Sequence, residues 1–210
     1  MTDFNKIRQL FDITENNGFS EDEIFVFKNV CENIPKKLFE YYLQLGKIKT
    51  LNQTQDRLLE PIRLTMSKNN DFLVFYSENQ WVCVWGINKN DLSVDNPPVY
   101  MSYNEQEWHQ ETYLLTDFLD AMANHQAVFA LKFCSEELRC IDNQDIKIIE
   151  KHFKKRECSF SKWIGIDFYG NHENDVIEVQ KNDDYYDLIY ASNNKQQFKA
   201  MYKILNQLGV

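Results

Sequence analysis

The spacing of the apolar residues changes along the chain, and this change constrains the fold more than any other feature. Over residues 1–70 the apolar residues keep the three- and four-residue spacing of amphipathic helices. A first helix is expected around Phe4, Ile7, Leu10 and Phe11. Ser20 followed by Glu23 is a capping-box pattern, which predicts a second helix carrying Ile24, Phe27, Val30 and Cys31. A short helix over Asp56–Leu59 is also expected.

The middle of the chain has the composition of β-strands, because β-branched and aromatic residues follow one another in short runs. Three strands are expected there, at Phe72–Tyr76, Trp81–Trp85 and Val99–Met101. The first two are joined by a turn-like segment, which predicts a hairpin. A helix of about four turns follows, from Leu115 to about Phe129.

The last third repeats the order of strands followed by a helix. A helix is expected over residues 143–154, and strands at Trp163–Tyr169, Val176–Val179 and Tyr186–Tyr190. An amphipathic helix containing Phe198, Met201, Tyr202, Leu205 and Leu208 closes the chain. These elements predict an α+β fold: a mostly antiparallel sheet packed with helices at the N-terminus, middle and C-terminus.

The length of the chain is compatible with one domain or two small ones. Hydrophobic residues make up 43% and charged residues 26%, as in ordinary globular domains. Because no low-complexity linker divides the sequence, a single domain over residues 1–210 is expected. That domain is expected to unfold cooperatively and without a metal ion.

The cysteines and the N-terminus indicate a cytoplasmic protein. The five cysteines are odd in number and none form a C-x-x-C pair, which favours free thiols in a reducing compartment. The first residues contain acids and no apolar run, so they do not form a secretory signal. No stretch approaches the ~20 apolar residues of a transmembrane helix.

Negative charge is concentrated in residues 71–125. The whole chain has a formal net charge of −9, and this segment holds nine acids and only Lys89 as a base. An acidic chain of this kind is not expected to bind nucleic acid, since that affinity comes largely from neutralising phosphates. The segment is either an ordinary solvated face or an acidic surface that steers a basic protein partner.

Residue patterns that carry catalysis are absent from the sequence. It contains no phosphate-binding glycine motif and no G-x-S-x-G motif, and no two histidines are spaced as H-x-x-x-H. Asp183-Asp184 is better explained as a hairpin turn than as a metal site. The basic run Lys151–Arg156 is read as the end of a helix. We therefore expect that the chain is not an enzyme and that it binds neither a cofactor nor a metal ion.

An ordered set of motifs resembles the SUKH superfamily, which includes bacterial immunity proteins and fungal cell-wall regulators. The motifs are Ile34-Pro35, Leu38, Tyr41-Tyr42, Gly46, Glu78-Asn79-Gln80, Trp85-Gly86-Ile87, Asn96-Pro97-Pro98-Val99, Trp108 and Phe118-Leu119. The resemblance covers residues 20–130, and the strands and helix at 163–209 are similar to the C-terminal part of the family. Ile34 stands where the family usually has Leu.

The resemblance implies one SUKH-like domain that neutralises a cognate bacterial toxin by binding it. Toxins paired with this family are often nucleases or nucleic-acid deaminases. The alternative is an intracellular regulatory or scaffold protein of the same superfamily.

Exposed loops that combine acids with aromatic residues are the expected partner-binding residues, since aromatic side chains anchor interfaces. The segment Tyr103–Trp108 is the first candidate, although Trp108 could equally be part of the core. The candidate residues are Tyr103, Glu105, Glu107, Trp108, Asp91, Asp95, Asp183, Asp184 and Tyr185.

Overall fold

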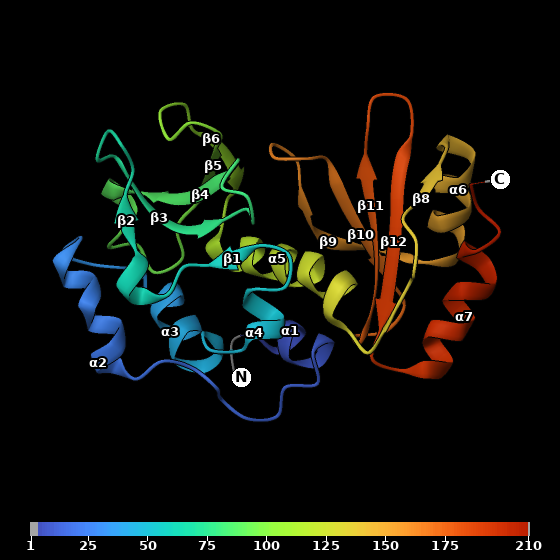
Figure 1. Ribbon diagram of the computed structural model, residues 1–210, viewed down its shortest axis with the longest axis horizontal. Helices are drawn as coiled ribbons and strands as arrows, with labels where there is room; N and C mark the ends of the chain where they lie inside the picture. Colours follow the sequence, from blue (N-terminus) through green and yellow to red (C-terminus); the bar gives the residue numbers. More distant parts are fainter. Residues whose placement is uncertain (1–3, 210) are drawn as a thin grey trace. The chain divides into compact units, whose positions relative to one another are not determined.

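The computed structural model describes residues 4–209 and has an α+β fold with two antiparallel sheets (Figure 1). The chain divides into two compact units. The middle unit runs from Glu15 to Leu119, and the C-terminal unit combines the residues up to Thr14 with those from Asp120 onward. The expected α+β class is confirmed, whereas the single cooperative domain stays a prediction.

Short helices open the middle unit. They are α2 (Glu21–Ile24), the 3₁₀ helix η1 (Phe25–Asn29), α3 (Lys36–Leu45), α4 (Lys49–Asn52) and η2 (Pro61–Arg63). Ser20 and Glu23 form the predicted capping box. The α-helix ends at Ile24 rather than continuing to Cys31. The apolar positions Ile24 and Phe27 are three residues apart, a spacing that suits a 3₁₀ helix as well as an α-helix.

One sheet forms the rest of the middle unit, with strand order β1-β3-β4-β5-β6 and β2 paired with β3. Its strands are β1 (Arg57–Leu58), β2 (Thr65–Met66), β3 (Phe72–Ser77), β4 (Val84–Asn88), β5 (Val99–Ser102) and β6 (His109–Thr112). The 3₁₀ helix η3 (Lys89–Asp91) follows β4. Every residue of β3 is buried.

Two further expectations in this unit are wrong, and one strand was not expected. Residues of the expected helix at Asp56–Leu59 form β1, which pairs with the end of β3. The strand expected from Trp81 begins only at Val84. Strand β6 was not expected, because its sequence HQET lacks the apolar residues that mark a strand; pairing with β5 creates it.

The C-terminal unit has its own sheet, in the order β7-β12-β11-β10-β9 with β8 also paired with β12. Its strands are β7 (Phe133–Cys134), β8 (Arg139–Ile141), β9 (Lys154–Phe160), β10 (Ile166–Gly170), β11 (Asp175–Lys181) and β12 (Tyr186–Ser192). Its helices are α1 (Asn5–Leu10), α6 (Asn143–His152) and α7 (Lys195–Leu205). Helix α5 (Leu115–Ala130) begins in the last residues of the middle unit.

Helices α6 and α7 cover one face of this sheet (Figure 1). Apolar side chains of both helices and of alternate strand positions form the core between them: Ile141, Ile149, Phe153, Tyr169, Ile177, Val179, Leu188, Tyr190, Met201, Leu205 and Leu208. The alternation in β11 places Ile177 and Val179 on this face, as the period of two requires.

The basic run Lys151–Arg156 is not simply a helix end. Helix α6 stops at His152, and Lys154 to Arg156 belong to β9, at the edge of the sheet. Lysines on an edge strand discourage pairing with another chain, which gives these charges a structural role. None of the helices within residues 4–209 is long and apolar enough to cross a membrane.

Candidate partner-binding surface

The loop between β3 and β4 carries two exposed apolar residues. Trp81 is 54% exposed and Val82 is 56% exposed. The Glu78 carboxylate accepts hydrogen bonds from the backbone N–H groups of Gln80 (2.8 Å) and Val82 (3.2 Å). The Asn79 N–H donates to the buried carboxylate of Asp56 at 3.2 Å. These bonds fix the loop, so the two apolar side chains are held at the surface.

The loop between β5 and β6 is fixed in a similar way. The Ser102 hydroxyl accepts the backbone N–H of Glu105 at 2.9 Å. The Asn104 side-chain oxygen accepts the N–H groups of Gln106 (2.8 Å) and Glu107 (2.9 Å). Side-chain to backbone bonds of this type stabilise turns. The loop therefore presents Tyr103, which is 55% exposed, in a defined position.

The register of the sheet brings these two loops together. Val84 at the start of β4 pairs with Ser102 at the end of β5. Trp81 and Val82, just before β4, therefore lie at the same end of the sheet as Tyr103, just after β5. Burial is the main cause of a raised pKa of Tyr103, and the nearby Cys83 contributes. We call residues 78–83 and 103–108 together the paired-loop surface.

Trp108 lies at the end of this surface but is packed inward. Its ring stacks on Phe72 with the ring centroids 4.2 Å apart and an interplanar angle of 14°. A Cβ atom placed on Gly86 would lie 3.0 Å from the same indole ring. Trp108 is half-buried. Its packing favours a place in the core of the unit over a role as an anchor for a binding partner.

The negative charge of residues 71–125 is less exposed than the sequence suggests. Asp71, Asp95, Glu107 and Asp117 are exposed; Glu78, Asp91, Glu105 and Asp120 are half-buried; Glu111 is buried. Glu105 also lies 3.8 Å from the ammonium group of Lys68, just outside the segment. On the paired-loop surface, Glu107 is therefore the exposed carboxylate.

Asp91 and Asp95 do not join this surface at the strand ends. Asp91 ends η3, directly after β4, whereas Tyr103 lies near the start of β4. Four residue steps along β4 separate these ends by about 14 Å. Asp95 lies near the start of α3, where its carbonyl accepts the Lys37 N–H at 3.0 Å.

Asp183, Asp184 and Tyr185 lie in the C-terminal unit. They form the loop of the β11–β12 hairpin, which is closed by a 2.9 Å hydrogen bond from the Asn182 N–H to the Tyr185 carbonyl. The turn expected for the two aspartates is confirmed. Tyr185 is 43% exposed, so this hairpin loop is a separate candidate surface.

The sequence analysis did not place Trp81 and Val82 among the candidate residues, because an unbroken apolar run was read as part of a strand. Glu78, which organises their loop, was named as part of a motif but not as a candidate binding residue. The turn-like Ser77–Gln80 segment just before them was the available signal.

Among the residues that the structure describes, no three His, Cys, Asp or Glu side chains gather as a metal-binding group. Comparisons of the chain with protein-family models, with curated proteins and with solved structures give no match.

Proposed function

We propose that this chain is a cytoplasmic immunity protein, which neutralises a cognate bacterial toxin by binding it rather than by catalysis. The motifs that resemble those of the SUKH superfamily, such as Trp85-Gly86-Ile87, support this function. The toxin would be a nuclease or a nucleic-acid deaminase. The paired-loop surface is the proposed contact.

The observation that carries the proposal is the conformation of Trp81. Its backbone φ angle is +62°, in the left-handed region that suits glycine or asparagine and costs other residues about 1 kcal/mol. Its side chain is nevertheless more exposed than buried. A large apolar residue that gains little from burial and occupies a strained turn fits a role in binding.

The composition of the surface supports a protein partner. Trp81, Val82 and Tyr103 supply the aromatic and apolar centre that interfaces usually have. The exposed Glu107 supplies negative charge beside them. Charge attraction would speed association with a basic toxin and weaken as salt is added, because the Debye length is about 8 Å at physiological ionic strength.

The test uses the toxin gene that the proposal expects immediately upstream of the gene for this chain. Co-expression with that toxin should restore bacterial growth, and the purified pair should bind in an interferometry assay. Trp81→Gly should weaken binding about tenfold or more, as expected of an interface tryptophan. The same change should leave the free energy of unfolding within about 1 kcal/mol, since glycine suits the turn.

Tyr113→Ala is the matched control. Tyr113 is 82% exposed and belongs to the same unit, but it follows β6 at Thr112, which pairs with the far end of β5. Its loss should leave binding unchanged. An unchanged affinity of Trp81→Gly for the toxin would exclude the paired-loop surface. A well-folded wild-type chain that neither binds nor neutralises the toxin would exclude the immunity function and favour the regulatory alternative.

A further inference from the structure

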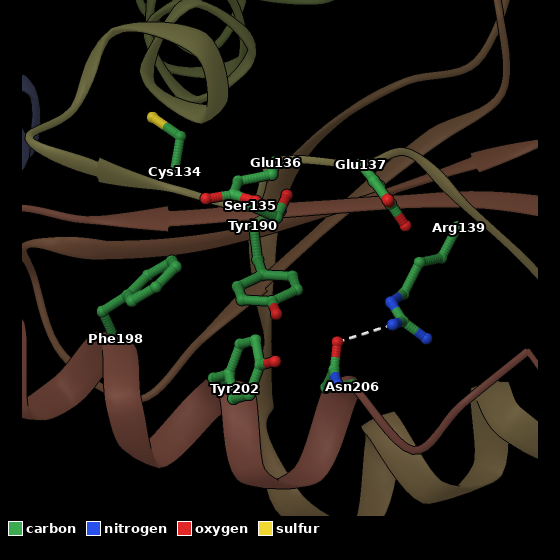
Figure 2. Close-up of a pocket in the computed structure, with 9 residues that line it drawn as sticks. All are labelled: Cys134, Ser135, Glu136, Glu137, Arg139, Tyr190, Phe198, Tyr202 and Asn206. Atoms are coloured by element: carbon green, nitrogen blue, oxygen red, sulfur yellow. Dashed lines mark hydrogen bonds between the residues drawn. The ribbon is translucent and has the colours of Figure 1, made fainter.

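A pocket in the C-terminal unit lies between the β7–β8 segment, β12 and α7 (Figure 2). Its volume is about 340 Å³, within the range of small-molecule sites. The lining residues are Cys134, Ser135, Glu136, Glu137, Arg139, Tyr190, Phe198, Tyr202 and Asn206.

Tyr190 is the most informative of these residues. The residue is only 1% exposed, yet within residues 4–209 its hydroxyl group makes no hydrogen bond. Figure 2 shows this hydroxyl in the pocket, on the side where Tyr202, Asn206 and Arg139 lie. Buried hydroxyl groups normally have a hydrogen-bond partner. The Tyr190 hydroxyl opens into the pocket, so a hydrogen bond from a ligand held there would meet this requirement.

Arg139 places a positive charge on the same side of the pocket. Its guanidinium donates to the Leu208 carbonyl at 3.0 Å and to the side-chain oxygen of Asn206. Two bonds hold the group in place and leave further N–H donors, since a guanidinium has five. Burial is the main cause of the raised pKa of Tyr190. The positive charge of Arg139 lowers this pKa, and the nearby Tyr202 raises it. The hydroxyl groups of Tyr190 and Tyr202 and the guanidinium group of Arg139 therefore lie on the same side of the pocket.

The other walls limit the class of ligand. The ring of Phe198 lies 5.5 Å from that of Tyr190, which gives the pocket an aromatic side. Glu136 and Glu137 are exposed at its rim. Their charges repel a multiply charged anion such as phosphate more strongly than a singly charged carboxylate.

We propose that this pocket binds a small monocarboxylate with an aromatic or apolar body. Arg139 and the hydroxyl groups of Tyr190 and Tyr202 hold the carboxylate, and the body packs against Phe198. The volume of about 340 Å³ suits a ligand at the small end of the range for such sites. This site is independent of the proposed toxin contact, which lies in the other unit.

The test compares probes of one shape and different charge. Hydrocinnamate carries the carboxylate, hydrocinnamamide is its neutral counterpart, and phenethylamine carries a cation. Titration of the full chain, followed by NMR, should show saturable millimolar or tighter binding of hydrocinnamate. The amide, the amine and inorganic phosphate should each bind at least about tenfold more weakly, since hydrogen bonds to a charged group are the strong ones.

Tyr190→Phe is the decisive variant, because the lost hydroxyl has no partner within the described chain and the fold should be unaffected. It should weaken hydrocinnamate binding about tenfold, the size expected for one hydrogen bond to a charged group. Tyr185→Phe, an exposed tyrosine of the same unit outside the pocket, should bind like the wild type. No saturable hydrocinnamate binding, equal binding of the amide or of phosphate, or unchanged binding by Tyr190→Phe would each overturn the proposal.

Discussion

Replacing Trp108 by alanine should destabilise the middle unit, because its ring is a packing element. The ring stacks on Phe72 and covers Gly86. A fully buried aromatic side chain hides about 200 Å². If about two-thirds of that area is removed from water here, burial contributes about 3 kcal/mol at 25 cal/mol/Å². Stacking adds about 1 kcal/mol, and a compact unfolded state subtracts a similar amount. The expected loss is about 3 kcal/mol.

Urea unfolding followed by far-UV circular dichroism measures this loss without relying on tryptophan fluorescence. Tyr103→Ala is the matched control from the same loop, and its loss should be under about 1 kcal/mol because the side chain is 55% exposed. If Trp108→Ala and Tyr103→Ala lose the same free energy, the packing argument is wrong. Trp108 would then become a candidate anchor for a partner, as the sequence also allows.

Three further predictions concern local contacts. Ser20→Ala removes half of the capping box and should cost about 1 kcal/mol in urea unfolding, whereas an unchanged midpoint would contradict the cap's contribution. Burial raises the pKa of Asp175 above 3.8, so ionisation opposes folding and stability should fall as pH rises through the folded pKa. Asp175→Asn should flatten that acid-range slope in unfolding curves measured at several pH values; an unaltered slope would refute it. Burial raises the pKa values of Cys83 and Cys158 to about 12, so iodoacetamide at pH ~8 should modify the exposed Cys140 well before them, as mass spectrometry would show.

The sequence alone determined the elements whose signals are local. The capping box at Ser20 formed as expected, because its partners are three residues apart. Helix α5 was predicted within one residue of its end, since a helix repeats its apolar face every three or four residues. The β11–β12 hairpin was predicted because apolar strands flank a turn rich in Asn and Asp.

Only the tertiary structure decided features that depend on residues far apart in the chain. Strands β1, β6 and β9 are polar or very short, and pairing with β3, β5 and β10 makes them strands. The division of the strands into two sheets also depends on the tertiary structure, because the order of the strands in the sequence does not determine which strands pair.

The candidate sites depend on tertiary structure for the same reason. The register that pairs Val84 with Ser102 brings the two loops together. The pocket needs Arg139, Tyr190 and Tyr202 from three separate elements, none of which has a distinctive sequence pattern. The periodicity of the apolar residues predicts which side chains are buried. Whether a polar group finds a hydrogen-bond partner depends on which residues the fold places opposite it.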